Sequence, residues 1–351
     1  MSNVIALNVR PVRQPQCQRL AAHAQLFVSD RRCEDDVFWL KENAEFLNIA
    51  ESTSQPGDAI LEHYEQVYAS ISDRLGEFPQ YYRFFLSICL DLEDLGMPGN
   101  TGETLCHWAH QTGLPDAELS DLQRAEAERL LARRNVGTPS VDLRDRLIRF
   151  INRPATFSIP NKKAAYELTH IVFYLSEYGR KDPGLSAPAL QSLRFAGLLA
   201  YLDQNHDLLA EICVALRYAG QTPSDIWERA VLSAHRHTYT EETAHVPPFD
   251  DYHVYLVSTW LAGLCDDPVF PLILSSGPHR IVMTPPAARP LRDLSRALDN
   301  LRHQDWPNAR DQICERLTPE AVNVVKAAEA STSDFDAFFE GFVRAAVPGR
   351  G

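Results

Sequence analysis

Residues that could bind a metal or move a proton are concentrated on one segment in the middle of the chain. This segment carries Glu167, His170, Tyr174 and Tyr178, which follow one another at separations of three, four and four residues. That spacing places all four along one stripe of an α-helix. A Glu-x-x-His pair on a helix can supply two ligands to a metal, as in helical di-metal carboxylate proteins. The stripe is therefore the first place where we expect a site, with Tyr174 beside the two metal-binding residues.

The same spacing, an acidic residue three positions before a histidine, occurs four times. With 12 histidines and 47 acidic residues in 351, chance gives roughly 1.6 such pairs. All four lie between residues 167 and 253, and they are Glu167/His170, Asp203/His206, Glu242/His245 and Asp250/His253. We expect His206 and His245 to be solvated, because they lie at a junction and in a loop. His253 is the preferred second histidine of the site.

Each of these residues also has a structural interpretation. His170 can be a neutral core imidazole that is hydrogen-bonded to Glu167. His253 can lie at the start of a helix, with Asp250 as its N-cap and Asp251 as a partner of the helix dipole. Cys106, His107 and His110 share one short predicted helix, but no fourth ligand is spaced near them, which favours packing over a metal site.

Composition and charge exclude several classes of protein. The formal net charge of -13 repels phosphate backbones and anionic lipids, so we expect no nucleic-acid or membrane partner. No apolar run approaches the ~20 residues of a membrane span, and the start lacks the pattern of a secretory signal, which favours a cytoplasmic location. Seven cysteines without a Cys-x-x-Cys pair argue against a disulfide framework and a zinc ribbon. Phosphate-loop, nucleophile-elbow, His-Glu-x-x-His and dinucleotide motifs are absent.

The pattern of apolar residues predicts an all-α protein, either an irregular multi-helical bundle or an α/α toroid. Apolar residues recur at helical spacing almost throughout the chain. The exception is 270–284, where two short apolar runs flank Ser275–Pro278 and predict a small β-hairpin. We expect a flexible tail over 1–16 and a single helical domain over 17–351, with a sub-boundary near 135–160. Helices are predicted at 35–50, 58–75, 80–95, 101–111, 120–134, 161–178, 187–202, 206–219, 224–235, 250–264, 291–303, 306–317, 318–330 and 333–346.

Four longer strings resemble an uncharacterised bacterial protein family, a domain of unknown function. They are DDVFWLKENAE from Asp35, FPQYYRFFLSICLDLEDLG from Phe78, YELTHIVFYLSEYGR from Tyr166 and DDYHVYLV from Asp250. The resemblance extends over nearly the whole chain and implies one architecture, but it transfers no catalytic residue. More distantly, ELTHIVFYL and YHVYLV are similar to helical bacterial proteins of unknown function, which implies that Glu167, His170, Tyr252 and His253 meet in space.

Three functional hypotheses follow. The leading one is a helical protein with a pocket lined by Glu167, His170, Tyr174 and His253, which holds a divalent metal and acts on a small molecule or peptide. His170 and His253 would then be metal ligands, with Glu167 a third ligand or a general base. The second hypothesis is a non-catalytic scaffold that binds a partner protein.

The third hypothesis is a metal-dependent phosphohydrolase. The order His170, His206-Asp207 and then Asp250 or Asp251 is similar to the His, His-Asp, Asp pattern of helical phosphohydrolases. In that family the His-Asp pair normally ends an apolar helix. Here the pair opens one, which counts against this hypothesis.

Overall fold

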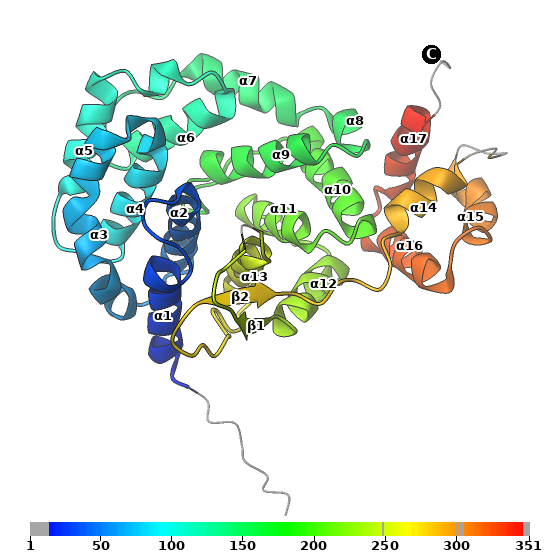
Figure 1. Ribbon diagram of the computed structural model, residues 1–351. Coiled ribbons are helices and arrows are strands. Elements are labelled where there is room, and N and C mark those ends of the chain that lie inside the picture. The colour runs from blue at the N-terminus through cyan, green and yellow to red at the C-terminus, as the bar shows by residue number, and fades with distance from the viewer. Residues whose placement is uncertain (1–13, 248, 299–300, 302–304, 347–351) are drawn as a thin grey trace, which may run out of the picture.

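The computed structural model describes residues 14–247, 249–298, 301 and 305–346. Within these residues the chain forms 17 α-helices and one two-stranded sheet (Figure 1), which confirms the predicted all-α class with one small hairpin. The first half contains α1 (Gln16–Gln25), α2 (Val37–Ser52), α3 (Asp58–Glu77), α4 (Tyr82–Asp94), α5 (Thr101–Gln111), α6 (Asp121–Ala132), α7 (Val141–Ile151), α8 (Pro154–Phe157) and α9 (Lys162–Leu175). The second half contains α10 (Ala187–Leu202), α11 (His206–Tyr218), α12 (Asp225–Arg236), α13 (Tyr252–Leu264), α14 (Pro290–Ala297), α15 (Trp306–Cys314), α16 (Pro319–Ser331) and α17 (Phe335–Ala346).

Three helices were not predicted from the sequence. α1 begins at Gln16, and most of the predicted tail, residues 1–13, lies outside the described residues. α7 and α8 occupy the segment 135–160, where Gly137 and Pro139 suggested a boundary. α7 buries Leu143, Leu147 and Ile151, a stripe at four-residue spacing that has the periodicity of a helix packed on one side.

The small sheet pairs two segments that are far apart in the sequence. Its second strand, β2 (His279–Val282), lies in the predicted hairpin region, but its antiparallel partner is β1 (Tyr239–Glu242), with Tyr239 opposite Val282. The first apolar run of that region, residues 271–274, is not a strand. Segment 239–242 does not alternate between buried and exposed residues, since its two ends are exposed and its two middle residues are half-buried. It therefore has no strand periodicity, and its pairing with β2 depends on how the chain returns past α13.

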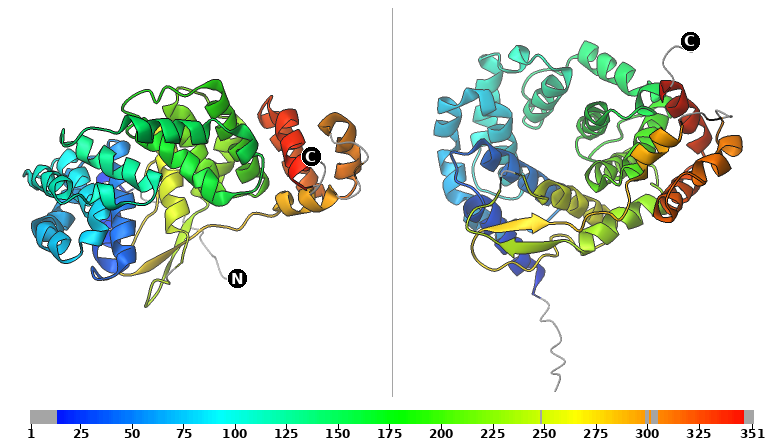
Figure 2. Two further views of the ribbon diagram at one scale, coloured as in Figure 1. Left: turned by 90° about the horizontal axis from the view of Figure 1, so that it is seen from above. Right: turned by 45° about the vertical axis from the view of Figure 1, so that its right-hand side comes forward.

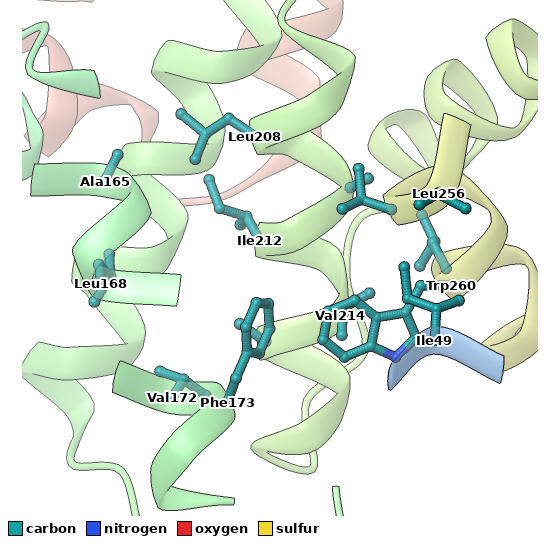
Figure 3. Packing of buried hydrophobic residues seen from close by; sticks show 14 of the residues in the cluster. Ile49, Ala165, Leu168, Val172, Phe173, Leu208, Ile212, Val214, Leu256 and Trp260 are labelled. Atoms are coloured by element: carbon teal, nitrogen blue, oxygen red, sulfur yellow. The ribbon is translucent and has the colours of Figure 1, made fainter. Parts of the chain in front are cut away.

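Helix α11 is the centre of the fold. All nine residues from Leu208 to Leu216 are buried, as expected for a helix surrounded by other helices. It packs against α9, α10, α12 and α13, and α13 in turn packs against α2. Figure 3 shows how apolar side chains of α2, α9, α11 and α13 meet, among them Ile49, Phe173, Ile212 and Trp260. These four helices also carry the candidate site.

The C-terminal helices α14–α17 lie at one end of the molecule, away from α1–α5 (Figure 2). Trp306 is buried against the rings of Phe335 and Phe339. α16 and α17 contact α10, and Arg194 of α10 forms an ion pair with Asp334. The segment 283–289 connects β2 to α14 and passes the start of α13.

A buried ion-pair network fixes the start of α13. Arg31 follows a π-helical turn (Leu26–Asp30), and its guanidinium donates to Glu42 of α2 at 2.7 Å and to Asp250 at 2.9 Å. Asp250 also accepts from the backbone N–H groups of Ile281 and Tyr252. Asp250 therefore supports the start of α13, but the prediction that it is the N-cap is wrong, because Asp251 is the N-cap residue and its side chain makes no cap hydrogen bond. The contacts of Asp250 also connect α13 to α2 and to β2.

In the described part of the chain, no helix combines the length and apolarity needed to cross a membrane.

Candidate metal centre

Four helices place five titratable side chains together. Asp207 and Glu211 lie four residues apart on α11 and therefore share one face of that helix. His253 lies in the first turn of α13, Glu45 on α2 and His170 on α9. Three of the helices are held by side-chain N-caps: Asp36 caps α2, Asn161 caps α9 and Asn205 caps α11.

His253 is in the middle of this group. Its Nδ1 donates to Oε2 of Glu45 at 2.9 Å. On the other side of the ring, Nε2 lies 3.3 Å from Oδ1 of Asp207 and 3.9 Å from Oε1 of Glu211. One ligand atom each from Asp207, Glu211 and His253 lies within 4.8 Å of the other two, a separation at which one cation could contact all three.

Hydroxyl groups hold the outer oxygens of both carboxylates. The Tyr166 hydroxyl donates to Oδ2 of Asp207 at 2.6 Å, and the Thr169 hydroxyl donates to Oε2 of Glu211 at 2.5 Å. Oδ1 of Asp207 is buried and accepts no hydrogen bond from the described residues, since its approach to His253 lacks hydrogen-bond geometry. A buried carboxylate oxygen without a donor is costly, so this atom requires an explanation.

The electrostatics of the group reflect an excess of negative charge. Burial alone would lower the pKa of His253, but the charges of Glu45, Asp207 and Glu211 outweigh it and raise that pKa to about 10. Burial raises the pKa of Glu211, whose side chain is only 2% exposed. For Glu45, burial is outweighed by the charge of His253, and the pKa is lowered. The negative charge of three carboxylates around one imidazole can be offset by a proton on His253 or on Glu211, or by a bound cation.

His170 approaches the same carboxylate from α9. Its Nδ1 lies 3.7 Å from Oε2 of Glu211, while His253 faces Oε1. The structure thus brings together the two histidines that the sequence suggested, although 82 positions separate them. Nδ1 of His170, however, donates to the backbone carbonyl of Tyr166 at 2.8 Å and is not available to a cation near Glu211. In this rotamer His170 is a neighbour of the centre and not one of its ligands.

The structure does not bring the other two predicted residues into the group. Glu167 lies 3.9 Å from Lys163 on the same helix, with a third of its side chain exposed. Tyr174 is buried one turn beyond His170, packed under the guanidinium of Arg129, and it lines a different cavity. The predicted stripe is right for Glu167, His170 and Tyr174, but α9 ends at Leu175, and Tyr178 lies beyond it with a φ of 55°. The neighbours also change along α9, from α11 near His170 to α6 near Tyr174.

Sequence reasoning missed Glu45 and Glu211, and it considered Asp207 only within the phosphohydrolase pattern. One signal was present: Glu211 is the only charged residue in the apolar run Leu208–Leu216, where a solvated position is not expected. Glu45 had no such signal, because it follows Lys41 at the spacing of an ordinary surface ion pair.

Four residues of the phosphohydrolase pattern, His206, Asp207, Asp250 and Asp251, line one cavity, but they do not gather around one position for a cation. Of the residues in the pattern, only Asp207 belongs to the cluster of metal-ligand atoms found in the described residues. Asp250 is bound by Arg31, and Asp251 accepts from the backbone N–H of Met283. Cys106 is buried, with its thiol directed at the carbonyl oxygen of Leu130, in agreement with the packing interpretation.

A solvent-open cavity of about 490 Å³ lies next to the centre. Asp207, His253 and Tyr166 form part of its wall, with His206 at the start of α11. The opposite side is formed by the connection between β2 and α14, which ends at Arg289. Burial and the nearby charge of Arg289 lower the pKa of His206.

The fold and the site together define an all-α protein with a carboxylate–histidine cluster between its central helices. The chain belongs to the family DUF6902, a domain of unknown function, whose profile matches residues 1–345. This match confirms the resemblance to a domain of unknown function that was noted in the sequence. As expected, the resemblance extends over nearly the whole chain. No curated protein and no solved structure matches the chain.

Proposed function

We propose that this protein is a metal-dependent enzyme in which Asp207, Glu211 and His253 bind one divalent cation. The observation that carries the proposal is the way each ligand is held. The second heteroatom of each side chain is hydrogen-bonded, by Tyr166, Thr169 and Glu45 respectively, while Oδ1, Oε1 and Nε2 turn toward one another. Metal-binding histidines commonly donate their other N–H to a carboxylate, as His253 does to Glu45.

The donor set favours particular cations. Two carboxylates and one imidazole suit Mn²⁺, Fe²⁺ or Zn²⁺ better than the softer Cu⁺, which prefers sulfur ligands. Three protein ligands leave coordination positions open for water or a substrate, as catalytic sites require. A cation there would act as a Lewis acid or activate a water molecule.

The adjoining cavity supports an enzyme over a purely structural metal site. Structural zinc sites are closed by four protein ligands, whereas Asp207 and His253 also line an open cavity. Its volume of about 490 Å³ is within the range of small-molecule sites. The proposed substrate is therefore a small molecule that enters beside α11 and α13.

Metal titration tests the proposal. Untagged protein is stripped with a chelator, and its affinities for Zn²⁺ and Mn²⁺ are measured by isothermal titration calorimetry. Asp207→Asn removes a ligand charge, and we expect it to weaken binding by ~100-fold or more, since even loss of an outer partner of a ligand costs 10–100-fold. The matched control is Asp203→Asn: Asp203 lines the same cavity but pairs with Lys162 at 2.9 Å.

Two results would contradict the proposal. One is a wild-type protein that takes up neither metal, and the other is equal metal affinity in the Asp207→Asn and Asp203→Asn proteins. Circular dichroism of each variant establishes that it is folded. A stable protein partner recovered with metal-free wild type would then favour the scaffold hypothesis.

A further inference from the structure

One positively charged side chain at the cavity has no acidic partner within the described residues. Arg289 lines the cavity and is exposed, and none of the ion pairs of the described chain includes it. Of the other charged groups of the wall, Asp207 and His253 belong to the proposed metal centre, and the remaining ones are engaged elsewhere. Lys162 pairs with Asp203, Asp250 with Arg31, and Asp251 with the backbone N–H of Met283. A positive charge is therefore available for a ligand.

The backbone around Arg289 holds it at this position. Asp251 anchors the connection at Met283, through a hydrogen bond of 2.8 Å. Pro285 and Pro286 then restrict the chain, and Pro290 begins α14 directly after Arg289. These residues restrict the backbone that positions Arg289 beside the cavity, while the exposed side chain keeps its own rotational freedom.

The opposite wall is also favourable to negative charge. α11 starts there, and the N-terminus of a 13-residue helix carries a partial positive charge. Asn205 caps one backbone N–H of the first turn, and His206 lines the cavity next to it. Arg289 and the start of α11 thus face the same space from two sides.

We propose that this cavity binds an anionic group, a phosphate or a carboxylate, of the small-molecule substrate, with Arg289 as the residue that pairs with it. The planar guanidinium can donate two parallel hydrogen bonds to either anion. The remainder of the molecule then reaches the wall formed by Asp207 and His253. This inference rests on the proposed metal centre for its catalytic meaning, but anion binding can be measured separately.

Ligand-observed NMR with two simple probes tests the inference. Inorganic phosphate and succinate represent the two anion types, and each is titrated into metal-free protein and into protein with one equivalent of Mn²⁺. We expect one probe to bind more tightly than the other. Arg289→Gln should lower the affinity for that probe by about 10-fold or more, which is the usual contribution of a charge-assisted hydrogen-bonded pair. Mn²⁺ should broaden the signals of the bound probe, because the anion lies in the cavity beside the metal.

Arg292→Gln is the matched control. Arg292 is also exposed and lies three residues further on, in the first turn of α14, but it does not line the cavity. Its substitution should change the affinity less than twofold, and neither variant should alter Mn²⁺ affinity.

The outcomes separate the two proposals. Equal anion affinity in the Arg289→Gln and Arg292→Gln proteins, or no binding of either probe to wild type, would overturn the anion site while leaving the metal centre intact. Arg289-dependent anion binding in a protein that takes up no Mn²⁺ would uphold the anion site and overturn the metal-dependent function.

Discussion

The buried ring of His235 makes the stability of this protein sensitive to acid. His235 on α12 is only 3% exposed, and its ring stacks on that of Tyr255 at 5.4 Å. Its ring nitrogens make no well-formed hydrogen bond within the described residues, and only the backbone of Pro268 interacts with the ring, with a small effect on its pKa. Burial lowers the pKa of His235 to about 4, and it also lowers the pKa of His23, which is hydrogen-bonded to the hydroxyl of Tyr255, to about 4.

The sign and size of the effect follow from these two pKa values. Between pH 6.5 and 4 the unfolded chain binds protons at these two histidines that the folded protein does not, so their contribution to the free energy of unfolding falls as the pH falls. His253, with its raised pKa, contributes in the opposite direction. For a histidine with pKa 6.5 unfolded and about 4 folded, the loss at pH 5 is about 2 kcal/mol. The two histidines together should therefore remove about 4 kcal/mol between pH 7.5 and pH 5.

The substitution His235→Phe isolates one of the two contributions. Phenylalanine keeps the ring stacked on Tyr255 and cannot be protonated. Urea unfolding of metal-free protein at pH 7.5 and pH 5 should show that the variant loses about 2 kcal/mol less than wild type. Groups that titrate elsewhere cancel in this difference, except for His23, whose pKa is lowered in part by the charge of His235.

His237→Phe is the control, since His237 is exposed at the end of α12. It should lose as much stability as wild type between the two pH values. The reasoning would be refuted if His235→Phe also showed the full wild-type loss, because His235 would then be protonated equally in the folded and unfolded states.

Three further predictions concern the metal centre and the core. Glu45→Gln should weaken Zn²⁺ or Mn²⁺ binding 10–100-fold by calorimetry, because the ring of His253 loses its carboxylate partner, while Glu167→Gln should leave the affinity unchanged. Arg31→Met should lower the free energy of unfolding by about 3–5 kcal/mol in urea, because two buried carboxylates lose their cation. The control Arg280→Met breaks an exposed pair and should cost less than about 1 kcal/mol. Similar losses in the two variants would contradict the role of burial. Ile212→Ala should cost about 2–5 kcal/mol by the same measurement, and a loss below about 1 kcal/mol would mean that α11 is not tightly packed.

The sequence by itself determined most of the helices and the approximate position of the candidate site. The helices predicted at 101–111 and 187–202 form with those bounds, because helical periodicity is a local property of residues three and four apart. The acidic-x-x-histidine pairs directed attention to His170 and His253, which meet at one carboxylate. The helix bounds and the acidic-x-x-histidine spacing both depend on information contained within single helices.

Tertiary structure alone decided which side chains form the proposed centre. Glu45, Asp207 and Glu211 are ordinary acidic residues in the sequence, and only the packing of α2, α11 and α13 places their oxygens around His253. Tyr239–Glu242 likewise pairs with β2 because the chain returns past it. The physical reason is the same in both cases. Periodicity specifies which face of a helix is apolar, but the partner of that face depends on how all the helices pack together, and no short segment contains that information.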